Sequence, residues 1–164
     1  LETPARNPEK ITAIALAGAA IPMNVHDDLL AQARDEPPAA IETILNWAYS
    51  KRSQIGGMRV PGLWMLGGGR RLIERNSDGQ LYIDFKACNN YLAGFESATK
   101  IRCPTLILVG GNDRMTSPKM ANNLQQAIPH SDLVYINGGG HMMMIEHPDE
   151  TLDVLKDFLE ALLL

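Results

Sequence analysis

The sequence feature that most constrains the fold is a pair of short apolar segments separated by one helix-length stretch. Residues 105–109 (Thr-Leu-Ile-Leu-Val) and 133–136 (Leu-Val-Tyr-Ile) are rich in β-branched residues, and glycines follow each of them. This pattern predicts two strands. Residues 118–128 favour a helix, because Ser117 is a suitable cap and Pro118 suits the first helical position. A strand, a helix and a strand with short connections form a βαβ unit, in which the two strands are parallel.

Two further elements extend this unit. The longest apolar run is 11–23, about half the roughly 20 residues that a membrane-spanning helix needs. It also has some character of a secretory signal, but the prolines and mixed charge of 1–10 disfavour that alternative. We therefore expect a strand over 11–16, buried on both faces as in a parallel sheet. Apolar residues at steps of three and four after Pro148 predict a helix over 148–164.

The middle of the chain, 25–100, shows no strand alternation. Helices are expected from Asn24 to Ala33, from Pro38 to Tyr49 and over 80–92. The Gly-rich, basic stretch 51–71 is predicted to be a mobile, solvated loop, with attraction of an anionic substrate as the alternative.

The predicted fold class is therefore α/β. It comprises a three-stranded parallel sheet with flanking helices and a helical insertion. The expected units are 1–24 (first core strand and exit loop), 25–100 (helical insertion) and 101–164 (a βαβα unit).

Charge and cysteine content narrow the class of protein. The chain has 164 residues and a net charge of −4, from 19 acidic and 15 basic side chains. This balance argues against a nucleic-acid partner, because nucleic-acid-binding proteins carry clustered positive charge. Two cysteines, Cys88 and Cys103, cannot form a disulfide framework and suit a reducing compartment. We therefore expect a cytoplasmic protein that binds neither nucleic acid nor a membrane.

Two polar residues follow the two strands of the βαβ unit. Asp113 comes just after the first strand and its glycines, and His141 follows three glycines after the second. Read singly, Asp113 is as readily a turn residue as a functional one, and a loop histidine is the favoured interpretation of His141. Carboxyl ends of adjacent parallel strands share one edge of the sheet, where ligands bind in open α/β sheets. A carboxylate that accepts a hydrogen bond from imidazole Nδ1 leaves Nε2 as a general base. The spacing thus predicts an acid–base pair.

These residues lie in segments that resemble the α/β-hydrolase family. Ile101–Asp113 resembles the family's late strand and acid loop. Ile128-Pro129, Gly140-His141 and Glu146-His-Pro148 resemble its final strand, histidine loop and last helix. The resemblance implies that 11–16, 105–109 and 133–136 are the last strands of a hydrolase sheet and that 25–100 is the cap. It also implies that Asp113 is the acid and His141 the base of a catalytic triad, with no cofactor required and the nucleophile first in chain order.

The sequence departs from the family at the nucleophile. G-x-S-x-G does not occur: no serine of the chain has glycines two positions to each side. Cys88 falls inside a predicted helix, Cys103 at the entry of a strand, and Ser117 is better explained as a helix cap. Because the chain also begins at Leu1 rather than Met, we expect a carboxy-terminal portion of a longer hydrolase.

Other site chemistries find less support. His141 and His147 are six residues apart, outside the usual helical ligand spacing, so no metal site is expected. The glycine triplets lack the Gly-Lys-Ser/Thr ending of a phosphate-binding loop. Met142–Met144 are expected to pack beneath the last helix, with lining of an apolar substrate pocket as the alternative.

The resulting expectation is a hydrolase of small carbonyl compounds (ester, thioester, lactone or C–C bond) that lacks its nucleophile and is inactive alone. Ser and Asp both remain open as the absent nucleophile. One alternative is a non-catalytic module that forms a homodimer through the exposed edge of the first strand. The other is a complete small hydrolase with an unrecognised nucleophile, which a serine-reactive fluorophosphonate would label.

Overall fold

The computed structural model describes residues 1–57, 62–76 and 78–163. Its sheet has three parallel strands in the order β1 (Ile14–Ala17), β2 (Thr105–Gly110) and β3 (Ser131–Ile136). In register, Ile14 pairs with Thr105, which pairs with Ser131. Helix α8 (Pro118–Ala127) connects β2 to β3. The predicted α/β class, the parallel βαβ unit and the three-stranded sheet are therefore confirmed.

The two faces of β2 bury side chains against different helices, as the period of two in a strand requires. Ile107 and Val109 pack with Ala121 and Leu124 of α8. Leu106 and Leu108 pack with Met143 and with partly buried side chains of α10 (Pro148–Ala161), namely Val154, Leu155 and Phe158. All six residues of β2 are buried, so this strand is the centre of the core.

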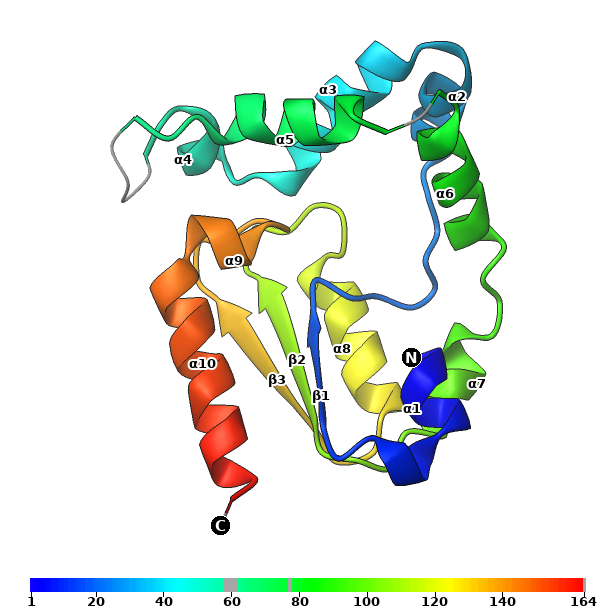
Figure 1. Cartoon of the computed structure of the whole chain (residues 1–164), viewed down its shortest axis with the longest axis vertical. Helices are drawn as coiled ribbons and strands as arrows, with labels where there is room; N and C mark the ends of the chain where they lie inside the picture. Colours follow the sequence, from blue (N-terminus) through cyan, green and yellow to red (C-terminus); the bar gives the residue numbers. More distant parts are fainter. Residues whose placement is uncertain (58–61, 77, 164) are drawn as a thin grey trace.

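A set of helices lies across the carboxyl ends of the strands (Figure 1). It consists of α2 (Asp27–Asp35), α3 (Pro37–Ala48), α4 (Lys51–Gln54) and α5 (Met65–Glu74), and we call it the helical layer. Apolar clusters hold it together, one of which contains Ile41, Leu45 and Met65. Helix α6 (Gln80–Asn89) follows the layer, and α7 (Gly94–Thr99) leads back to the sheet.

The prediction of a loop over 51–71 was wrong for residues 51–54 and 65–71, whereas 55–57 and 62–64 are non-helical. Residues 51–54 and 65–74 are helical, and 58–61 lie outside the described residues. In α5, Met65 is buried and Gly69 packs so closely on α3 that a Cβ there would come 2.9 Å from Leu45 Cδ2. Packing against α3 thus outweighs the low helix propensity of three consecutive glycines.

Several predicted boundaries also shift. The first strand begins at Ile14 instead of Ile11. Helix α2 begins at Asp27 and is capped by His26 Nδ1, which accepts from the Asp28 N–H, instead of by Asn24. Short helical segments that were not predicted are α1 (Glu2–Arg6), the 3-10 turn Pro8–Lys10, α7 and α9 (Met143–Glu146). Ser117 does occupy the N-cap of α8, but its side chain makes no capping hydrogen bond.

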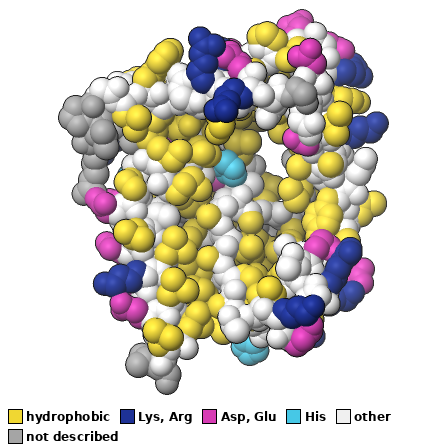
Figure 2. All heavy atoms as spheres, in the orientation of Figure 1, with side chains coloured by type: hydrophobic (Ala, Val, Ile, Leu, Met, Phe, Trp, Pro, Cys, Tyr) yellow, Lys and Arg dark blue, Asp and Glu magenta, His cyan; other side chains and the backbone are white. Residues whose placement is uncertain are grey.

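Helix α10 presents part of its apolar stripe to solvent. Leu155 and Phe158 pack on the sheet, whereas Leu152 and Leu159 are exposed. Ala15 and Ala17 of β1 are exposed as well. Figure 2 shows hydrophobic side chains gathered over the sheet beside α10. Within the described residues, this face of the sheet is thus covered near β3 and uncovered near β1.

Candidate active site

The carboxyl ends of all three strands converge beneath the helical layer. Gly18 follows β1, Asp113 follows β2 and His141 follows β3. Backbone hydrogen bonds join the last two loops: Gly111 N–H donates to Ile136 O (2.9 Å) and Asn112 N–H donates to Gly139 O (2.8 Å). The two loops after β2 and β3 therefore form one hydrogen-bonded rim, which we call the acid–histidine rim.

Asp113 is the most heavily bonded side chain of this rim. It is 3% exposed, and its Oδ1 accepts the backbone N–H groups of Met115 and Thr116, both at 2.8 Å. Its Oδ2 accepts the Thr116 hydroxyl at 2.7 Å and lies 3.0 Å from His141 Nδ1. Four donors thus fix the carboxylate in one orientation, with one oxygen facing the imidazole.

The pKa of Asp113 is lowered from its ordinary value. Burial on its own raises the pKa of this carboxyl, but the hydrogen bonds from His141 and Thr116 and the nearby imidazole outweigh burial. The site is therefore built to keep Asp113 ionised, which favours the tautomer of His141 that carries its proton on Nδ1.

The His141 side chain is 25% exposed and reaches the rim beside Gly18. Gly18 has φ +60°, and a Cβ there would come 2.9 Å from His141 Cε1 and 3.0 Å from its Nδ1. A side chain at position 18 would thus push the ring away from Asp113. With Nδ1 directed at Asp113 and Thr116, Nε2 is the ring nitrogen left for a substrate or a nucleophile.

His141 and Thr116 line a cavity of about 780 Å³ whose walls are mainly apolar. Side chains from distant parts of the chain form these walls, among them Leu16, Met23, Val25, Phe85, Cys88, Met115 and Met120. Among the described residues that line it, Glu2 is the one acidic side chain, and it is hydrogen-bonded to Tyr91 and Ser97. The imidazole therefore borders a space suited to an uncharged, largely apolar group.

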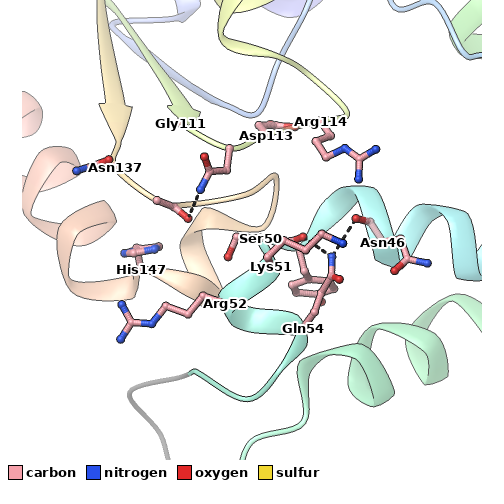
Figure 3. Close-up of a pocket in the computed structure, with 13 residues that line it drawn as sticks. Asn46, Ser50, Lys51, Arg52, Gln54, Gly111, Asp113, Arg114, Asn137 and His147 are labelled. Carbon is pink, nitrogen blue, oxygen red and sulfur yellow. Dashed lines mark hydrogen bonds between the residues drawn. The ribbon is translucent and has the colours of Figure 1, made fainter.

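A second cavity, of about 850 Å³, lies on the other side of the rim, between its loops and α4 (Figure 3). Most of the residues that line it are polar or charged, and they include Lys51, Arg52, Arg114 and His147. Although this cavity is the larger, His141 does not line it. We therefore take the apolar cavity as the candidate site, because the imidazole that is paired with Asp113 borders it.

Sequence reasoning missed Thr116 and Glu146. Thr116 stands three residues after Asp113, the spacing at which an Asp side chain commonly accepts a hydrogen bond in a turn. Glu146 follows the apolar stretch 142–145 and is 5% exposed. A carboxylate within an apolar segment requires buried donors, which was the available signal.

The remaining residues singled out in the sequence fall outside the pair. Cys88 lies in α6 and lines the apolar cavity, whereas Cys103 precedes β2 at the opposite end of the sheet. Met143 packs beneath α10 as predicted, but Met142 packs on the helical layer and Met144 is exposed. Among the described residues there is neither a metal-binding group of three or more His, Cys, Asp or Glu side chains nor a helix long and apolar enough to cross a membrane.

Comparisons with known proteins give a consistent result. A structure of a thermophilic esterase superimposes with a TM-score of 0.79 and 28% identity over 97% of this chain. The enol-lactonase from Burkholderia xenovorans LB400 has a TM-score of 0.82 and 20% identity over 96% of the chain, a likeness of fold. The chain spans 60% of the length of each of these two structures.

Sequence relatives match over a shorter stretch. Lipase 1 of Psychrobacter immobilis is 33% identical over 61 residues, which are 37% of this chain and 19% of the lipase. The model of the alpha/beta hydrolase fold family matches residues 39–148, which include both Asp113 and His141. This match extends over more than half of the sequence, and the chain belongs to the alpha/beta hydrolase fold family.

Proposed function

We propose that this chain supplies the acid and the base of a hydrolase triad, and that the nucleophile lies outside its 164 residues. The observation that carries the proposal is the contact of 3.0 Å between His141 Nδ1 and a buried Asp113 carboxylate that Thr116 holds in place. The absence of G-x-S-x-G from the sequence supports the second part. In this proposal, 25–100 corresponds to the cap of the family.

In the proposed reaction, His141 Nε2 accepts the proton of the nucleophile as it attacks a substrate carbonyl. The Asp113 carboxylate stabilises the imidazolium that forms. The imidazolium then gives the proton to the leaving group, and water releases the acyl group by the reverse sequence of proton transfers.

The apolar cavity favours an uncharged acyl substrate, such as an ester, thioester or lactone. The esterase, the enol-lactonase and the lipase to which the chain is similar support the same class of substrate. The two free cysteines support a cytoplasmic location.

Two forms of the protein test this function. The chain of 164 residues should not hydrolyse a short-chain nitrophenyl ester and should not react with a fluorophosphonate. The same chain, fused behind the amino-terminal part of the thermophilic esterase that contains a nucleophile, should hydrolyse the ester.

In the fusion, His141→Ala should reduce kcat on the order of 10⁶-fold. His147→Ala, a histidine outside the pair, is the matched control and should leave kcat within a few-fold. Ester hydrolysis by the 164-residue chain alone, or a fully active His141→Ala fusion, would contradict the proposal.

The uncovered face beside β1 favours a second candidate, association with another copy of the chain. Among the described residues β1 pairs only with β2, and Ala15 and Ala17 on it are exposed, as are Leu152 and Leu159 of α10. An unpaired strand edge with apolar neighbours promotes pairing between chains. Light scattering at micromolar concentration should then give twice the chain mass, and Ala15→Lys should give a monomer. A monomeric parent chain would eliminate this candidate.

A further inference from the structure

Glu146 is a buried carboxylate that connects the acid–histidine rim to the helical layer. Its Oε1 accepts the backbone N–H of Gly140 at 2.9 Å. Its Oε2 accepts the backbone N–H of Ser50 at 2.9 Å and the hydroxyl of Ser53 at 2.6 Å. One carboxylate therefore joins the residue before His141 to the start of α4.

The residue after His141 is tied to the same place. The backbone N–H of Met142 donates to Ala48 O, at the end of α3, at 3.2 Å. Gly140 lies so close to this junction that a Cβ there would come 2.7 Å from Ser50 N and 2.8 Å from Ala48 O. His141 is thus held on both sides by the α3–α4 junction, while its ring faces Asp113.

We propose that Glu146 is a positioning residue: its carboxylate fixes the backbone on which His141 sits, and thereby keeps the imidazole Nδ1 directed at Asp113. The proposal rests on the proposed function for its catalytic meaning, because the ring it positions is the proposed base. Glu146 borders neither the substrate cavity nor the imidazole in the described contacts, so it acts through the backbone.

Glutamine is an informative replacement because it keeps the shape and changes the hydrogen bonding. Oε1 and Oε2 of Glu146 each accept one backbone N–H, from Gly140 and from Ser50. A backbone N–H cannot reverse its role. Whichever way the amide of Gln is turned, its NH₂ group faces one of these two N–H donors. A buried donor without an acceptor then remains, and the local structure must shift.

The test is carried out by NMR on the 164-residue chain, so it needs no hydrolytic activity. In the parent protein we expect the ¹⁵N chemical shifts of the His141 ring to be those of an imidazole protonated on Nδ1. We also expect the amide proton of Gly140 to exchange slowly with solvent. Glu146→Gln should raise the Gly140 exchange rate at least tenfold and mix the His141 tautomers, while β2 amides stay protected. Glu9→Gln, which removes the same charge at an exposed position, should change neither signal.

Ser53→Ala is the milder variant, because it removes one donor and leaves both backbone contacts. Ser53→Ala should raise the exchange rate of the Gly140 amide about threefold. If Glu146→Gln does not fold, this variant tests the positioning role in its place. Unchanged His141 shifts and Gly140 exchange in a folded Glu146→Gln protein, or in Ser53→Ala, would overturn the positioning role. That outcome would leave the triad proposal unaffected. The opposite combination, in which Glu146→Gln alters the His141 shifts but the fusion enzyme is inactive, would overturn the triad proposal and leave the positioning role unaffected.

Discussion

The acid–histidine rim and the helical layer lie against each other but are held together by different forces. In the rim and at its junction with the layer, two buried carboxylates, Asp113 and Glu146, accept hydrogen bonds from seven donors, two of which, the Ser50 N–H and the Ser53 hydroxyl, come from the start of α4. In the layer, apolar side chains such as Leu45 and Ile41 fill the space between helices. Hydrogen bonds require one geometry, whereas apolar packing requires mainly volume. The rim should therefore tolerate fewer changes than the layer.

The largest effect is expected where the rim loses a carboxylate. Asp113→Ala leaves four donors without their acceptor in a buried place, so it should reduce the free energy of unfolding by about 3 kcal/mol. Urea unfolding at pH 7 measures this loss. Thr116→Val, which removes only the hydroxyl donor, should cost about 1 kcal/mol.

The effect of Asp113→Ala should depend on pH. Because the folded state lowers the pKa of Asp113, its contribution is complete above the unfolded pKa of about 3.9 and is lost as the pH falls through the folded value. The difference between the parent and Asp113→Ala should thus shrink below pH 4. A constant difference down to pH 2 would contradict the ionic origin of this stability.

A cavity in the helical layer should have a somewhat smaller and more local effect. Leu45 is 3% exposed and packs with Ile41 and Met65, so Leu45→Ala should cost about 2.5 kcal/mol. Hydrogen exchange should show faster exchange in α3 and α5 while β2 amides remain protected. Equal loss of protection in β2 would mean that layer and sheet unfold as one unit.

One substitution made in both regions gives the sharpest contrast. Gly140→Ala places a Cβ 2.6 Å from Glu146 Oε1 and 2.7 Å from Ser50 N, which should destabilise by about 2 kcal/mol. Gly68→Ala lies in α5 with nothing within 4 Å of the new Cβ, so it should stabilise by about 0.5–1 kcal/mol. Thermal unfolding of both variants should move Tm in opposite directions. If both substitutions changed Tm in the same direction, the rim and the layer would not differ in their tolerance of an added methyl group.

The smallest effect concerns Glu2, outside both regions. Hydrogen bonds from Ser97 and Tyr91 and the neighbouring Arg6 lower its pKa from 4.5 to about 2. Its contribution to stability is therefore present above pH 4.5 and lost as the pH falls toward 2. Glu2→Gln should be slightly less stable than the parent at pH 6 and equal to it near pH 2. A difference that persists at pH 2 would assign the effect to packing.

The same contrast explains what the sequence could predict. Strands β2 and β3, α8 and the Asp113–His141 juxtaposition follow from local signals, because a βαβ unit brings the ends of its strands together. The helix at 65–74 could not be predicted, since its glycines favour a loop until α3 packs against them. Glu146 was missed because its donors at Ser50 and Ser53 are more than 90 residues away in the chain.

The sheet order β1-β2-β3 has a consequence for how the chain folds. The connection from β1 to β2 is about four times as long as that from β2 to β3. Each doubling of a flexible loop adds about 0.6 kcal/mol to the cost of closing it. A fourfold difference in length is two doublings, so pairing of β2 with β3 is favoured entropically by about 1.2 kcal/mol, and β1 should join last. The acid and the imidazole both belong to the part that closes first, so they should meet before the strand that carries Gly18 is in place.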